Sequence, residues 1–294
     1  MKTQKNILIA FILNLAFAVF EFLGGVFTGS VAIVSDAVHD LGDAVGIGVS
    51  WWLEKKSRRQ PDDQYSYGYL RYSVLGSFIT TIILLLSSGT VICNAIGRLI
   101  APRPIDYNGM ILFAVVGVCV NFIAAFFTRE GDSLNQKAVN LHMLEDVLGW
   151  LAVLVGAVVM RFTHWAVIDP LLSIGVAVFI LVHGAKHLKQ ILDLFLEKVP
   201  KGISLRTIKA QLSSLEGVLE VHHLHIRSID GQHHYATMHI VTNGEPHKIK
   251  DLVRRTLREH GIGHATLELE APGEPCREKE CHIHFTATGH HHHH

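Results

Sequence analysis

Residues 31–53 read VAIVSDAVHDLGDAVGIGVSWWL, an apolar stretch that carries one histidine and three aspartates between positions 36 and 43. About twenty apolar residues in a helix, at 1.5 Å per residue, cross the ~30 Å hydrocarbon core of a bilayer. Blocks of similar length and polarity recur along the chain, so the pattern predicts an α-helical membrane protein. The six expected spans are 6–28, 31–53, 72–97, 108–128, 138–160 and 167–190.

The composition agrees with a membrane protein. Of 294 residues, 49% are hydrophobic and only 18% are charged, whereas charged residues make up about a quarter of an ordinary soluble domain. The formal net charge is zero, which predicts no nucleic-acid partner. The four cysteines follow no pattern typical of secreted disulfide frameworks.

Basic residues in the loops set the expected orientation. Lysine and arginine collect on one side of the predicted spans, and the other side has only Arg98, Arg103 and Arg161. The positive-inside rule therefore predicts that both termini are cytoplasmic. The first apolar block has spanning length, so we interpret it as a membrane helix and not as a removed signal peptide. We predict a multi-pass protein of the inner (plasma) membrane, with residues 1–197 as its transmembrane domain.

The composition turns soluble after the break at Pro200. We expect a helix over 204–215, strands over 218–229 and 234–242 joined by an Asp230-Gly231 turn, a helix over 247–260 and a strand over 265–270. This α-β-β-α-β order predicts a small cytoplasmic α+β domain over residues 198–284. The terminal stretch 289–294 is interpreted as a purification tag.

Ionisable side chains inside two predicted spans are the strongest functional signal, because burying such groups in lipid is costly. His39 and Asp43 are four residues apart, as are His142 and Asp146. A spacing of four puts each pair on one helical face. For a single such pair the ordinary explanation is a helix-stabilising contact; two pairs in two spans favour a shared binding site.

The donor set indicates the kind of ion. Two imidazoles and two carboxylates suit tetrahedral zinc, whereas magnesium and calcium prefer six or more oxygen ligands. Cadmium, cobalt and iron(II) remain open. We therefore predict a transported metal, zinc first and Cd²⁺ or Co²⁺ as alternatives, at His39, Asp43, His142 and Asp146.

Several motifs resemble the cation diffusion facilitators, which are proton-coupled zinc exporters, and the resemblance covers nearly the whole chain. It rests mainly on Ser35-Asp-Ala-Val-His-Asp-Leu-Gly-Asp43 and on His142-Met-Leu-Glu-Asp146. A His-x-x-x-Asp pair on both helices is similar to the zinc-transporting branch. The resemblance implies a homodimer in the lipid bilayer, whose metallochaperone-like cytoplasmic domains meet below the membrane, with protons as the counter-ion.

The resemblance also implies regulatory zinc in the cytoplasmic domain. His222, His239 and His247 match positions that bind such zinc, and Glu270 replaces an aspartate ligand. The tail adds Cys276, Cys281 and His282 as ligands. Strand alternation puts His223 and His225 on one face and His222 on the other.

A loop site known in some members is not expected here. Tyr65 and Tyr69 stand where that site has histidines, and tyrosine is a poor zinc ligand at neutral pH.

These features predict a secondary active cation/proton antiporter and not an enzyme. An intramembrane metalloenzyme would keep a coordination position open for water, whereas four ligands close the tetrahedron. A metal-gated channel remains an alternative. A non-transporting sensor would leave the buried charges unexplained.

Overall fold

The computed structural model describes residues 2–28, 31–100, 107–130, 133–163, 167–274 and 276. The chain divides into two compact units, Met1–Leu196 and Glu197–His294, and each is described by itself.

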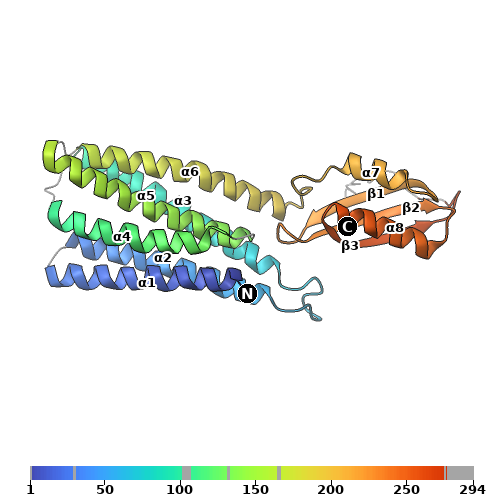
Figure 1. Ribbon diagram of the computed structural model, residues 1–294, viewed down its shortest axis with the longest axis horizontal. Helices are drawn as coiled ribbons and strands as arrows, with labels where there is room; N and C mark the ends of the chain where they lie inside the picture. The colour runs from blue at the N-terminus through green and yellow to red at the C-terminus, as the bar shows by residue number, and fades with distance from the viewer. Residues whose placement is uncertain are drawn as a thin grey trace, which may run out of the picture. The chain divides into compact units, whose positions relative to one another are not determined.

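The first unit is a bundle of long helices that lie side by side (Figure 1). Within the described ranges, every helix of this unit except α2 contains a segment long and apolar enough to cross a membrane. Helix α2 differs because it carries three aspartates and a glutamate. The predicted helical membrane domain is thereby confirmed. The helices are α1 (Lys2–Thr28), α2 (Val31–Ser57), α3 (Arg71–Ile100), α4 (Tyr107–Thr128), α5 (Leu134–Thr163) and α6 (Ile168–Phe195).

Glycines allow close packing of these helices. A Cβ added at Gly48 of α2 would lie 3.0 Å from Phe11 of α1, and one added at Gly46 would lie 2.8 Å from Ile83 of α3. At Gly117 of α4 it would lie 2.6 Å from the ring of Trp150 on α5. Small residues bring membrane helices together in this way, and they hold α2 and α5 within the same bundle.

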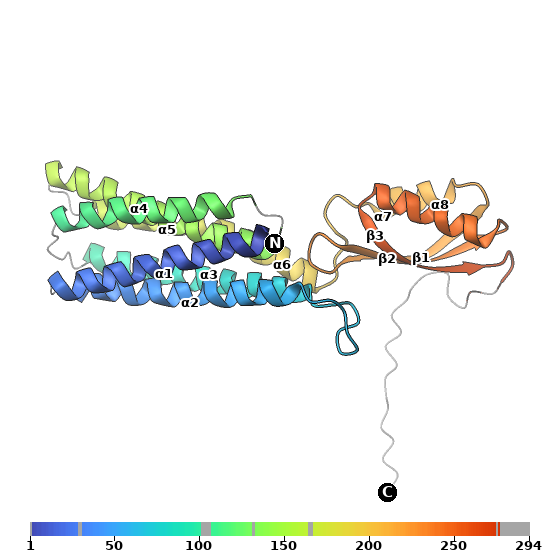
Figure 2. The ribbon, with the colours of Figure 1, turned by 60° about the horizontal axis from the view of Figure 1, so that its bottom comes forward.

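The second unit is a three-stranded sheet with two helices on one side (Figure 2). Its α8 is strongly amphipathic and buries Ile249, Val253 and Leu257, which are four residues apart. Strands β1 and β2 pair antiparallel, and β2 and β3 pair parallel. The α-β-β-α-β domain is confirmed. Its elements are α7 (Leu205–Ser213), β1 (Val218–Ser228), β2 (His234–Thr242), α8 (Pro246–Glu259) and β3 (Ile262–Glu270).

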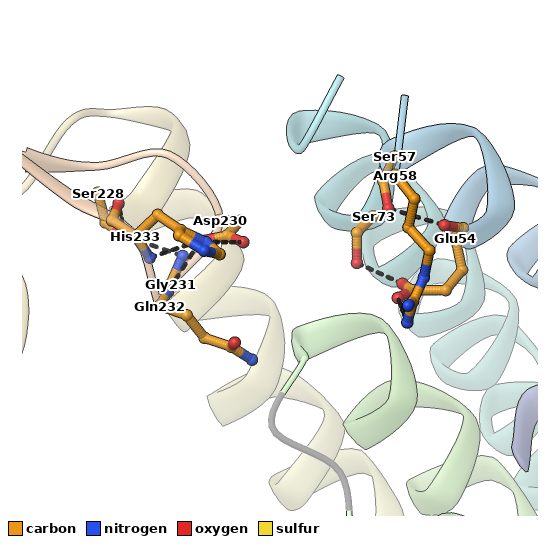
Figure 3. A network of polar contacts seen from close by, with 9 residues as sticks. All are labelled: Glu54, Ser57, Arg58, Ser73, Ser228, Asp230, Gly231, Gln232 and His233. Carbon is orange, nitrogen blue, oxygen red and sulfur yellow. Dashed lines mark hydrogen bonds and ion pairs between the residues drawn. The ribbon is translucent and has the colours of Figure 1, made fainter. Parts of the chain in front are cut away.

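The β1–β2 turn has the expected chemistry. Gly231 has φ 95°, a conformation that favours glycine. The Asp230 carboxylate accepts backbone N–H bonds from Gln232 (2.9 Å) and His233 (2.8 Å) (Figure 3). Strand β3 begins at Ile262 instead of at 265, because Gly261, with φ 76°, turns the chain directly out of α8.

The pairing of β1 with β2 is interrupted between His222 and His225. His223 has φ 49° there, which marks a β-bulge. This irregularity decides where the histidines of β1 point.

Candidate metal sites

Helices α2 and α5 bring three of the four predicted membrane ligands together. Asp43 lies on α2, and His142 and Asp146 lie one turn apart on α5. One ligand atom from each residue lies within 4.8 Å of the others. Asp43 is 5% exposed and His142 is 2% exposed. His39 lies on α2 one turn before Asp43, and its side chain lies outside the described part of the structure.

The site contains buried polar atoms that need a partner. Among the described residues, Nδ1 and Nε2 of His142 and Oδ2 of Asp146 have no hydrogen bond. His142 Nε2 lies 3.7 Å from Asp43 Oδ2, which is too far for a hydrogen bond. Buried polar groups are normally paired, so the donor set fits a cation that would use these lone pairs.

Glu145 lies beside this cluster on α5. The Ser88 hydroxyl of α3 donates a hydrogen bond to Glu145 Oε1, while Glu145 Oε2 lies 3.8 Å from His142 Nδ1. Asn140, also on α5, donates hydrogen bonds to the Ala125 carbonyl (2.8 Å) and to Thr128 Oγ1 (3.0 Å) on α4. Asn140 therefore joins α5 to α4.

Residue Glu54, near the end of α2, forms a second buried polar centre. Its Oε2 accepts hydrogen bonds from Ser73 Oγ (2.6 Å) on α3 and from Asn135 Nδ2 (3.3 Å) on α5. Arg58 lies 3.6 Å from Oε1, and Figure 3 shows its guanidinium beside the carboxylate. Asn135 also accepts from Ser50 Oγ at 2.5 Å. This network was not predicted from the sequence, in which only the position of Glu54, directly after the predicted span 31–53, points to it.

The loop between α2 and α3 is organised around Asp62. Its Oδ1 accepts the backbone N–H groups of Gln64 (3.0 Å) and Tyr65 (2.9 Å), and its Oδ2 accepts the Tyr69 hydroxyl (2.6 Å). The Tyr69 bond is the main cause that lowers the pKa of Asp62, and the two backbone bonds lower it further. Tyr69 therefore acts as a hydrogen-bond donor to this carboxylate, and its ring packs against that of Tyr65 with centroids 4.5 Å apart.

A second cluster of potential ligands lies in the cytoplasmic unit. His222, His223, His239 and Cys276 each place one ligand atom within 4.8 Å of the others. Cys276 Sγ lies 3.5 Å from His223 Nε2. Thiolate and imidazole are typical zinc donors. Strand alternation predicts His222 and His223 on opposite faces, which is wrong here because the bulge turns both side chains toward His239.

Glu270, at the end of β3, connects two of these histidines. Its Oε1 lies 2.7 Å from His239 Nδ1, and its Oε2 lies 3.2 Å from His222 Nε2. Burial raises the pKa of Glu270, but the hydrogen bond with His239 and the neighbouring His222 outweigh burial and lower the pKa overall. An ionised carboxylate in this place would favour a cation bound by the neighbouring imidazoles.

The remaining predicted cytoplasmic residues lie elsewhere. His247 is exposed on α8, with Nδ1 3.2 Å from Asp251 of the same helix. Cys281 and His282 lie outside the described residues.

The sheet face away from the helices carries a cavity of about 260 Å³, lined in part by His223, His225 and His239. This cavity opens beside the His222–Cys276 cluster.

The fold and the two clusters define a helical membrane protein in which potential metal ligands are grouped in both units. Residues 7–196 match the family described as cation efflux transmembrane domain. Residues 200–271 match the family described as cation efflux protein, cytoplasmic domain. The chain therefore belongs to the cation efflux family: it is a multi-pass membrane transporter with a C-terminal cytoplasmic domain.

Named relatives align along almost the whole chain. It is 30% identical over 297 residues to zinc transporter ZitB of Escherichia coli, covering 99% of this chain and 94% of that protein. It is 30% identical over 291 residues to the metal cation efflux system protein CzcD of Cupriavidus metallidurans, covering 97% and 92%. A cadmium, cobalt and zinc/H(+)-K(+) antiporter of Bacillus velezensis is 29% identical over 276 residues, covering 91% and 88%.

Proposed function

We propose that this protein exports a divalent metal, zinc foremost, from the cytoplasm in exchange for protons. Cargo would bind at His39, Asp43, His142 and Asp146. The names of relatives support zinc as cargo, cadmium and cobalt as alternatives, and protons as counter-ion.

One observation carries the proposal. Asp43, His142 and Asp146 place ligand atoms within 4.8 Å of one another inside an apolar bundle, and atoms of His142 and Asp146 are buried without hydrogen bonds in the described structure. Helical spacing puts His39 on the same face of α2 as Asp43. A closed set of two imidazoles and two carboxylates matches tetrahedral zinc.

The same residues supply the proposed coupling. A cation needs neutral imidazole and ionised carboxylate, so loading the site releases protons, and protonation weakens metal binding. A site that is alternately exposed to the two sides of the membrane would therefore exchange one cargo for the other. The required coupling lies in the ligands themselves.

We also propose a homodimer in the inner membrane, with both termini cytoplasmic and metal bound at the cytoplasmic cluster as a regulatory ligand. The cytoplasmic family match and the proximity of His222, His223, His239 and Cys276 support this part. Metal binding there would shift the equilibrium between domain arrangements by its difference in affinity for them.

The test is zinc uptake into proteoliposomes under an imposed pH gradient. We expect Asp43→Ala and Asp146→Ala to abolish saturable uptake. Asp193→Ala is the matched control, because this α6 carboxylate pairs with Lys189 one turn away and should leave uptake unchanged. Wild-type uptake by Asp146→Ala protein would refute the assignment, and single-channel currents would favour a channel.

A further inference from the structure

We propose that Glu145 is a positioning residue for the metal site: it holds the Nδ1–H of His142 so that Nε2 faces the cargo ion. The inference rests on the proposed function of His142 as a cargo ligand. It assigns a role to a carboxylate that is not itself one of the four ligands.

The imidazole of His142 lies between two carboxylates. Nε2 is 3.7 Å from Asp43 Oδ2, and Nδ1 is 3.8 Å from Glu145 Oε2. The His142 side chain is 2% exposed and that of Glu145 is 12% exposed. The two ring nitrogens and Glu145 Oε2 are buried without hydrogen bonds in the described part of the chain. Each ring nitrogen thus faces its own carboxylate.

A neutral imidazole has one N–H donor and one lone pair, and a metal takes the lone pair. The carboxylate that accepts the remaining N–H therefore selects which nitrogen binds the ion. Asp43 belongs to the ligand set, so Nε2 is the nitrogen on the cargo side. Glu145 is the acceptor on the opposite side of the ring.

The 3.8 Å separation is longer than a hydrogen bond. Contacts of this kind tighten when the ligand is present, and their looseness without it is common. Withdrawal of the Nε2 lone pair by a cation makes Nδ1–H a stronger donor toward Glu145. We therefore expect this bond to form fully in the loaded site.

Ser88 fixes the other oxygen of Glu145. Because its hydroxyl donates to Oε1, rotation of the carboxylate is restricted and Oε2 stays directed at His142. Ser88 belongs to α3, so a third helix orients a ligand that α5 carries. Its hydroxyl is fully buried, which suits a fixed donor.

The experiment measures initial zinc uptake in proteoliposomes against zinc concentration. Loss of a group that orients a metal ligand typically costs about 10–100-fold in metal affinity or activity. We expect Glu145→Ala to raise KM by about that factor and to lower the maximal rate less. Glu145→Gln keeps an oxygen acceptor, so its KM should lie between those of the wild type and Glu145→Ala.

Ser88→Ala should raise KM less than Glu145→Ala, and adding it to Glu145→Ala should change little, because the two groups act as a unit. Thr90→Ala is the matched control, since that exposed α3 hydroxyl donates to the Ser87 carbonyl of its own helix; it should leave KM unchanged.

An unchanged KM in both Glu145→Gln and Ser88→Ala would overturn the inference. So would a Glu145→Gln variant whose KM is raised as much as that of Glu145→Ala while the KM of Ser88→Ala stays normal. If Glu145→Ala does not fold, the Gln and Ser88 variants decide. The proposed function is tested separately, by Asp43→Ala. If Asp43→Ala loses uptake while the Glu145 and Ser88 variants have a normal KM, only the positioning role is refuted.

Discussion

Glu54 is 4% exposed and Asp43 is 5% exposed, yet the two residues of α2 have different surroundings. Ser73, Asn135 and Arg58 supply fixed donors to Glu54. Near Asp43, polar atoms of His142 and Asp146 are left without hydrogen bonds in the described structure. A satisfied buried carboxylate stabilises a fold, whereas incompletely paired neighbours leave room for a ligand.

The Glu54 network predicts a stability defect. Asn135→Ala removes the amide that contacts both Ser50 and Glu54, and an unsatisfied buried group costs about 1–3 kcal/mol. We expect a lower Tm for the purified protein in detergent, measured by tryptophan fluorescence. Gln64→Ala, in an exposed loop position, is the control. A Tm equal to that of the wild type would show that the network contributes no stability.

Asp62 gives a prediction about pH. Its pKa is lowered in the folded protein, mainly by the Tyr69 hydroxyl. The stabilisation is therefore present above the ordinary pKa, about 3.8, and is lost as the pH falls through the lowered folded value. Tyr69→Phe should raise the pKa of Asp62, as measured by ¹³C NMR of labelled aspartate with Asp62→Asn for assignment.

Tyr65→Phe is the matched control for that titration. The Tyr65 hydroxyl contacts Tyr72 at 3.1 Å, whereas its backbone N–H still donates to Asp62. The low pKa of Asp62 should persist in this variant. Equal shifts in the two variants would contradict the role given to the Tyr69 hydroxyl.

At the level of elements, segment length and periodicity predicted most of the fold. Apolar length predicted α1 to α6 because a bilayer demands about twenty residues per span, and the amphipathic pattern of residues 204–215 predicted α7. The His-x-x-x-Asp spacing likewise selected Asp43, His142 and Asp146, which α2 and α5 bring together. These signals are local and repeat along the chain.

The bulge in β1 could not be predicted in this way. Strand alternation assumes regular pairing, but the register shifts between His222 and His225, which no local composition marks. The Glu54 network was missed for a related reason: its partners Ser73 and Asn135 lie on other helices. Tertiary pairing decides both features.

The bulge gives a prediction at this scale. At His223, with φ 49°, a β-branched residue is strained, whereas asparagine tolerates the left-handed region. His223→Val should therefore destabilise the cytoplasmic domain more than His223→Asn, by about 1–2 kcal/mol, in denaturant unfolding followed by circular dichroism. At exposed His225, in regular strand, His225→Val should be more stable than His225→Asn. If valine and asparagine rank in the same order of stability at both positions, the bulge at His223 is contradicted.

For the whole molecule, the family resemblance and the structure indicate different side chains for the proposed cytoplasmic metal site. The resemblance implies His247 as a ligand, whereas the structure places His223 and Cys276 beside His222 and His239. His247 instead contacts Asp251 on the surface of α8. A ligand from the partner protomer would reconcile the two sets.

Zinc should raise the unfolding temperature of the full-length protein's cytoplasmic domain, because a ligand at 100 times its Kd stabilises by about 2.7 kcal/mol. We expect His239→Ala and Cys276→Ser to reduce this shift and His247→Ala to leave it intact. Differential scanning calorimetry with zinc and with a chelator measures it. If only His247→Ala loses the zinc-dependent rise in unfolding temperature, the ligand set His222, His223, His239 and Cys276 of one chain is contradicted. A site completed by a ligand from the partner protomer is then favoured.

The Glu54 network has a mechanical consequence for transport. Its hydrogen bonds join α2, α3 and α5 at one end of α2. The helices could therefore tilt relative to one another about this end. Asp43 precedes Glu54 on α2 by about 16 Å of helix rise, and a tilt of ~10° about this end would swing Asp43 by about 3 Å. This displacement of Asp43 exceeds the ~2 Å length of a zinc–ligand bond. If Asp43 binds the cargo as proposed, a tilt of this size, with the hydrogen bonds at Glu54 intact, would be enough to release the ion.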